Sequence, residues 1–217
     1  MSLQSVETRT KAEVAYTVLR DAIREGRLAP GSRLVLREVA DDLGMSFTPV
    51  REALQTLAAQ GLVEQRPHVG TVVASFTPER AEEVYRLRAV LEPLAARLAT
   101  ERATDEDVAR AETVLARLDD AVRHARSSAV PELNAAFHRA LYAACGSPYL
   151  VEFVDRLWNG LPYQAISLAS RAQDSHVEHR AILDAFRSRD AERCAALVTA
   201  HVASGAAAFL SRAGAPA

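Results

Sequence analysis

Residues 43–54 read LGMSFTPVREAL, and this stretch decides how the N-terminal third of the chain is expected to fold. Gly44 ends one segment of periodic apolar residues, and Ser46 offers an N-cap hydroxyl to the next segment. Pro49 falls in the opening turn of that segment, where its missing N–H costs no hydrogen bond. The stretch therefore predicts two helices joined by a tight turn at 43–46, which is a helix-turn-helix.

The residues on either side complete this unit. Periodic apolar positions predict helices over residues 11–24, 36–43 and 48–60. Strand-like runs follow at 62–65 and 71–74, and the turn composition between Pro67 and Gly70 joins them as a hairpin. Three helices followed by a two-stranded wing predict a winged helix-turn-helix.

The rest of the chain is predicted to be helical. Residues 75–78, SFTP, break the periodicity and are the expected linker. The expected helices beyond them cover residues 78–100, 104–125, 129–145, 148–172, 175–188 and 190–212. Short connections predict an antiparallel all-α bundle. The expected fold is mainly α, with a flexible N-terminus at 1–8, the winged domain at 9–74 and the bundle at 79–213.

Composition and charge exclude some classes without identifying a partner. The chain has no apolar run near 18 residues and no signal peptide, so we expect a cytoplasmic protein without a membrane partner. Cys145 and Cys194 match no metal or redox spacing and are expected to be buried thiols. The formal net charge is -2, and residues 1–76 hold nine basic and nine acidic side chains. DNA affinity depends on charge at one face, so residue positions must decide.

A helix-turn-helix presents the start of its second helix to the major groove of DNA. The residues expected to face bases or phosphates are Ser46, Phe47, Thr48 and Arg51 on that helix, Arg33 and Arg37 before it, and Arg66, His68 and Gly70 at the wing tip. The spacing leaves one alternative open, a three-helix domain whose Arg37 and Arg51 are ordinary solvated charges.

Three histidines lie on apolar faces of three different expected helices in the bundle. His138 stacks one turn after Asn134, while His179 and His201 lie on apolar stripes of the last two helices. Inward side chains of facing helices can build a metal site in a bundle. Histidines that are simply hydrogen-bonded inside the core explain the same pattern, and spacing alone does not choose between the two.

The N-terminal segments resemble the GntR family of bacterial transcription regulators. Residues 26–34, GRLAPGSRL, are similar to the family's G-x-L-x-P-G-x-x-L segment, and residues 46–54 to its S-R-T-P-V-R-E-A-L recognition helix. Phe47 stands where the family usually carries a DNA-contacting arginine. The chain therefore loses one cationic contact there and gains an apolar side chain that suits a thymine methyl group.

From Thr77 onward the chain resembles the FCD effector domain of the FadR branch, through residues 88–92, 134–138 and 178–182 and His201. The expected six helices are more similar to the VanR-type subgroup. Members often hold a divalent metal with one Asp or Asn and three His. The resemblance implies zinc, or alternatively nickel or manganese, bound by Asn134, His138, His179 and His201.

Asn134 occupies a position where many relatives have an aspartate. A neutral amide and three neutral imidazoles would leave the +2 charge uncompensated by the protein, which favours a small carboxylate effector as a further ligand. Arg88 is the candidate second anchor for that carboxylate, and an i,i+4 pair with Glu92 is the alternative. His176 is a possible competitor of His179, whereas His124 is expected in solvent.

The expected function is that of a metabolite-responsive repressor. A homodimer would place two winged domains on half-sites of a near-palindromic double-stranded DNA operator. The first alternative is a regulator whose effector domain is metal-free and only dimerises, or binds a different ligand. The second is a metal-dependent enzyme, but the sequence has no H-E-x-x-H motif, nucleophile elbow or phosphate loop, and we expect no enzymatic activity.

Overall fold

The computed structural model describes residues 9–75, 77–124, 129–159 and 172–213. The segment expected to be a flexible N-terminus, residues 1–8, lies outside these ranges. The chain separates into two compact units, Met1–Ser75 and Phe76–Ala217, each with a hydrophobic core of its own. We describe each unit by itself.

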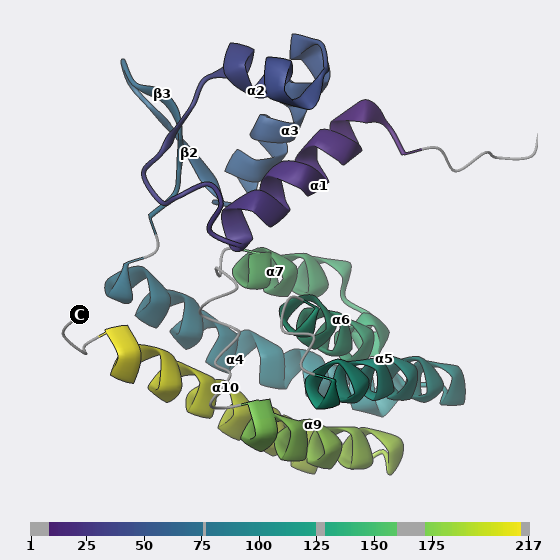
Figure 1. Cartoon of the computed structure of the whole chain (residues 1–217). Coiled ribbons are helices and arrows are strands. Elements are labelled where there is room, and N and C mark those ends of the chain that lie inside the picture. Colours follow the sequence, from purple (N-terminus) through teal and green to yellow (C-terminus); the bar gives the residue numbers. More distant parts are fainter. Residues whose placement is uncertain (1–8, 76, 125–128, 160–171, 214–217) are drawn as a thin grey trace, which may run out of the picture. The chain divides into compact units, whose positions relative to one another are not determined.

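The first unit is a three-helix domain with a small sheet (Figure 1). Its helices are α1 (Lys11–Arg24), α2 (Leu36–Leu43) and α3 (Phe47–Ala59), and its strands are β1 (Arg33–Leu34), β2 (Val63–Arg66) and β3 (Gly70–Val73). The sheet is antiparallel in the order β1-β3-β2. The expected helices and hairpin are present within one residue of their expected bounds.

Two details of this unit differ from the sequence-based expectation. The wing has three strands, because Arg33 and Leu34, expected in a loop, pair with Val72 and Thr71 of β3. Ser46 does occupy the N-cap position of α3, but its side chain makes no capping hydrogen bond. The turn is stabilised instead at its other end, where Gly44 adopts a left-handed conformation and Met45 N–H donates to the Ala40 carbonyl.

The described residues of the second unit form helices joined by short connections, with no strand among them. Its elements are α4 (Pro78–Arg102), α5 (Asp105–Arg123), α6 (Val130–Tyr142), the 3-10 turn η1 (Ala143–Cys145), α7 (Pro148–Asn159), α9 (Ala172–Arg187) and α10 (Ala191–Ala213). The predicted helix 148–172 corresponds to α7 as far as residue 159. Its residues 160–171 lie outside the described residues, and residue 172 belongs to α9. The fold is therefore mainly α, a winged helix-turn-helix followed by a helical domain, as predicted.

Small residues let the helices of the second unit approach one another closely. Ala95, Ala96 and Ala99 of α4 are buried, and α4 packs against α10, which also contacts α9. Residues Ala191–Ser211 of α10 are long and apolar enough to span a membrane, by length and composition alone. One face of α10, including Val198 and Val202, lies in the hydrophobic core instead.

Gly44 offers a direct test of the turn. Its φ is +62° and an added Cβ would meet no atom within 4 Å, so only backbone strain opposes a side chain there. We expect Gly44→Ala to lower the free energy of unfolding by about 1 kcal/mol. Gly44→Asn is the matched control, and it should lose less because asparagine tolerates this conformation. Equal chemical-denaturation midpoints for all three proteins would contradict the turn geometry.

Candidate metal centre and DNA interface

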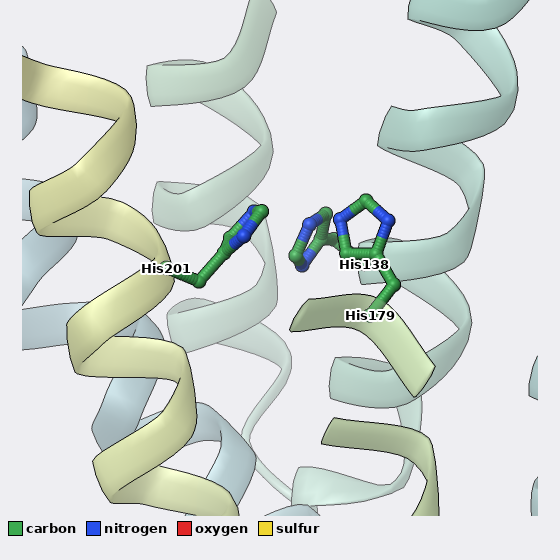
Figure 2. Close-up of side chains that lie close together, drawn as sticks. All are labelled: His138, His179 and His201. Carbon is green, nitrogen blue, oxygen red and sulfur yellow. The ribbon is translucent and has the colours of Figure 1, made fainter. Parts of the chain in front are cut away.

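Three helices bring three imidazoles together inside the second unit. His138 comes from α6, His179 from α9 and His201 from α10, and all three are buried. Figure 2 shows the rings turned toward one another. Their centroids lie 5.1 Å apart for His138 and His179, 4.9 Å for His138 and His201, and 4.7 Å for His179 and His201.

The donor set fits a borderline divalent cation. One ring nitrogen from each histidine lies within 4.8 Å of the others. Nitrogens bound to one zinc ion at about 2.1 Å lie about 3 to 3.5 Å from each other, so small ring rotations would suffice. Nε2 of His138 is buried and has no hydrogen-bond partner among the described residues. A metal ligand role would satisfy that nitrogen.

Groups outside the cluster contact a ring nitrogen of each histidine. Nδ1 of His138 lies 3.2 Å from the Tyr142 hydroxyl, and Nδ1 of His201 lies 2.7 Å from a Glu178 carboxylate oxygen. Nε2 of His179 lies 3.4 Å from Oγ of Ser175. Metal-binding histidines in proteins commonly have such partners, because the partner fixes the orientation of the ring.

The other two ligand candidates differ in what the structure says of them. Asn134 lies one helical turn before His138 on α6, is half-buried, and makes no side-chain hydrogen bond within the described residues. Arg88 is buried and forms the pair with Glu92 that the sequence left open, with 2.5 Å between Nε and Oε1. Its guanidinium also lies 4.2 Å from the centre of the Trp158 ring.

The remaining two histidines of this unit lie outside the cluster. His176, the possible competitor of His179, has Nδ1 2.5 Å from a carboxylate oxygen of Asp119. His124 is exposed at the end of α5, 3.0 Å from a carboxylate oxygen of Asp120. Neither ring belongs to the candidate metal centre.

Sequence reasoning missed the carboxylate that contacts this centre. Glu178 adjoins His179 in the sequence, and its carboxylate contacts Nδ1 of His201 on the next helix. An uncompensated +2 charge was expected from the four direct ligands alone. The Glu178 carboxylate lies next to one of these ligands, His201. Tyr142 carried a readable signal, since it follows His138 by one helical turn.

Burial dominates the protonation behaviour of His138. Desolvation holds the pKa of His138 well below its ordinary value, and the neighbouring His201 and His179 lower it further. The pKa of Tyr142 is raised well above its ordinary value by burial and by the adjacent Glu92. His138 is therefore neutral near pH 7, the state in which an imidazole can bind a metal.

The first unit exposes all nine residues expected at the DNA, which lie on α2, at the start of α3 and its N-cap, on the sheet and in the turn of its hairpin. Arg33, Arg37 and Arg51 form no ion pair within the described part of the chain. Nη2 of Arg66 lies 3.2 Å from a carboxylate oxygen of Glu64, and this carboxylate partly neutralises the positive charge that Arg66 presents to DNA. Phe47 is 49% exposed at the first position of α3.

One of these arginines, Arg33, belongs to the sheet of the wing. Arg33 pairs with Val72 in the sheet, and its Nε would lie 3.9 Å from a Cβ added at Gly70. Gly70 has a φ of +96°, and His68 adopts a left-handed conformation with a φ of +62°. Free arginines beside an exposed helix start and a wing are the features of a sequence-reading DNA-binding domain.

Comparison with known proteins agrees with this class. Residues 11–73 match the bacterial regulatory proteins of the gntR family, and residues 83–204 match the FCD domain. The chain belongs to the GntR family and carries a C-terminal FCD domain. It is a DNA-binding transcription regulator and not an enzyme.

Individual relatives support the same assignment. The HTH-type transcriptional regulator McbR of Escherichia coli (strain K12) is 31% identical over 81% of this chain and 82% of its own length. The HTH-type transcriptional repressor GlaR of the same organism is 28% identical over 86% and 90%. The solved structure of E. coli McbR/YncC superposes with a TM-score of 0.81 at 26% identity, covering 94% of this chain and 99% of the other.

The lowered pKa of His138 predicts how stability depends on pH in the metal-free protein. Below the ordinary histidine pKa of about 6.5 the unfolded chain takes up a proton that folded His138 does not bind. The free energy of unfolding should therefore fall as pH is lowered from 7 to 5. His138→Leu should reduce this slope, whereas His124→Ala should keep it. Urea titrations at several pH values measure the slope, and an unchanged slope in His138→Leu would contradict the burial argument.

Proposed function

We propose that this regulator is a metabolite-responsive repressor whose FCD domain binds a small organic acid through a divalent metal. The observation that carries the proposal is the convergence of three buried imidazoles on one point. Zinc is the first candidate, with nickel and manganese as alternatives, because imidazole nitrogen suits all these borderline ions.

His138, His179 and His201 would hold the metal, with Asn134 as a fourth ligand from the turn before His138. None of the four carries a negative charge, and the Glu178 carboxylate contacts Nδ1 of His201. When bound, the metal would supply a positive charge that attracts and orients an anionic ligand. This supports a small carboxylate as the effector. Arg88 is a less direct anchor, because Glu92 already occupies its guanidinium.

We propose that the first unit reads DNA with the start of α3 in the major groove and the wing on the phosphates or the minor groove. Its base-facing residues would be Ser46, Phe47, Thr48 and Arg51. The other expected contacts, mainly to phosphates, are Arg33, Arg37, Arg66, His68 and the backbone at Gly70. Their exposure supports these roles.

A homodimer would place two such units on the half-sites of a near-palindromic operator. Leu87, Val90 and Leu94 support this assembly, because they recur on one face of α4 and expose large apolar side chains. An effector that binds one dimer geometry better would shift the population away from the DNA-competent state. A cytoplasmic location follows from this function.

Arg51→Ala tests the DNA interface. Loss of a phosphate or base contact should weaken binding to the operator about 5-fold to 150-fold, from a cost of about 1 to 3 kcal/mol. Fluorescence anisotropy at several salt concentrations should also show a shallower salt dependence if the contact is to a phosphate. Arg27→Ala is the matched control, since Arg27 is exposed in the same unit but pairs with Glu25. Equal affinities of the two variants would contradict the proposed interface.

His138→Ala/His179→Ala/His201→Ala tests the metal. The purified wild type should contain about one divalent ion per chain after zinc reconstitution, and chelation should remove its response to organic acids. The triple variant should bind no zinc at this site and should lose the response. Retention of an acid response by a folded triple variant would favour the metal-free alternative. His124→Ala serves as the control, because His124 is exposed and outside the cluster.

A further inference from the structure

A chain of buried polar groups connects α4 to the candidate metal centre. Nε of Arg88 and Nε1 of Trp158 both donate to Oε1 of Glu92, at 2.5 and 3.0 Å. The hydroxyl of Tyr142 donates to the other carboxylate oxygen at 2.8 Å. The same hydroxyl lies 3.2 Å from Nδ1 of His138. All five side chains are buried, so water does not compete for these hydrogen bonds.

The donor in each hydrogen bond of this polar network follows from the chemistry of the groups. The guanidinium of Arg88 is always a donor, and both oxygens of Glu92 accept, Oε1 from Arg88 and Trp158 and Oε2 from Tyr142. A phenol has a single proton, and Tyr142 gives it to Glu92. The oxygen of Tyr142 can therefore only accept from His138. A contact between that oxygen and Nδ1 requires a proton on Nδ1.

We propose that Tyr142, held by Glu92, is a positioning residue that fixes His138 as the Nδ1–H tautomer. A neutral imidazole has one N–H, so this tautomer leaves the lone pair on Nε2. Nε2 is the nitrogen that has no partner among the described residues. The contact thus selects in advance the nitrogen that the proposed metal requires. The metal part of this inference rests on the proposed function, whereas the tautomer does not.

The same network assigns a role to Arg88 and Trp158. Removing either group would leave the buried carboxylate of Glu92 with fewer donors, which is costly in a low-dielectric core. Arg88 is therefore a support for Tyr142 through Glu92. The effect on His138 passes through three helices, since Glu92 belongs to α4, Trp158 to α7, and Tyr142 and His138 to α6.

Histidine nitrogen NMR of the metal-free, full-length protein tests the tautomer directly. The spectrum of the wild type should show His138 protonated at Nδ1 and unprotonated at Nε2. Tyr142→Phe removes the acceptor and should give a mixture of both tautomers. Tyr149→Phe is the matched control, because Tyr149 is exposed on α7, and it should keep the wild-type spectrum. Protonation of His138 at Nε2 in the wild type would overturn the proposal without any variant.

Zinc titration separates this inference from the proposed function. Tyr142→Phe should weaken zinc binding about 10-fold to 100-fold, as loss of an orienting partner does at other metal sites. Tyr149→Phe should bind zinc like the wild type. Equal zinc affinity of a folded Tyr142→Phe protein would overturn the positioning role. If the wild type shows the Nδ1–H tautomer but binds no zinc, the tautomer assignment is supported and the metal function is the part that fails.

Discussion

Burying three imidazoles side by side in a helical core requires a partner for every ring nitrogen, because an unsatisfied polar atom in such a place costs about 1 to 3 kcal/mol. The second unit meets this constraint at one nitrogen of each ring, through Tyr142, Glu178 and Ser175. Nε2 of His138 is different, since it is buried and has no hydrogen bond within the described residues. A cation would satisfy it where packing alone does not.

This constraint also shapes the elements around the cluster. Glu92 on α4 can orient Tyr142 because Arg88 balances its charge in the core. Glu178 on α9 is partly exposed and contacts Nδ1 of His201 on α10. The imidazoles and the residues that contact them, directly or through Tyr142, thus come from helices α4, α6, α9 and α10. In the sequence, α4 follows the winged unit directly.

The sequence predicted what local signals encode. Gly44 and Pro49 mark the helix-turn-helix within a few residues, and the histidine faces follow from helical periodicity. The two-residue strand β1 escaped prediction because it exists only through pairing with Thr71 and Val72. The Glu92 contacts to Tyr142 and Trp158 escaped for the same reason, since they join residues 50 and 66 positions apart. Arg88 forms the i,i+4 pair with Glu92 that the sequence left open, and its role toward a ligand stays a prediction.

X-ray absorption spectroscopy of the zinc-reconstituted protein tests the central claim most directly. Our account predicts one zinc ion bound by three imidazoles and by light oxygen or nitrogen ligands at about 2.0 to 2.2 Å. It predicts no sulfur ligand, because Cys145 and Cys194 are buried thiols outside the histidine cluster. A spectrum with fewer than three imidazoles, or with a zinc–sulfur distance of about 2.3 Å, would contradict the histidine centre.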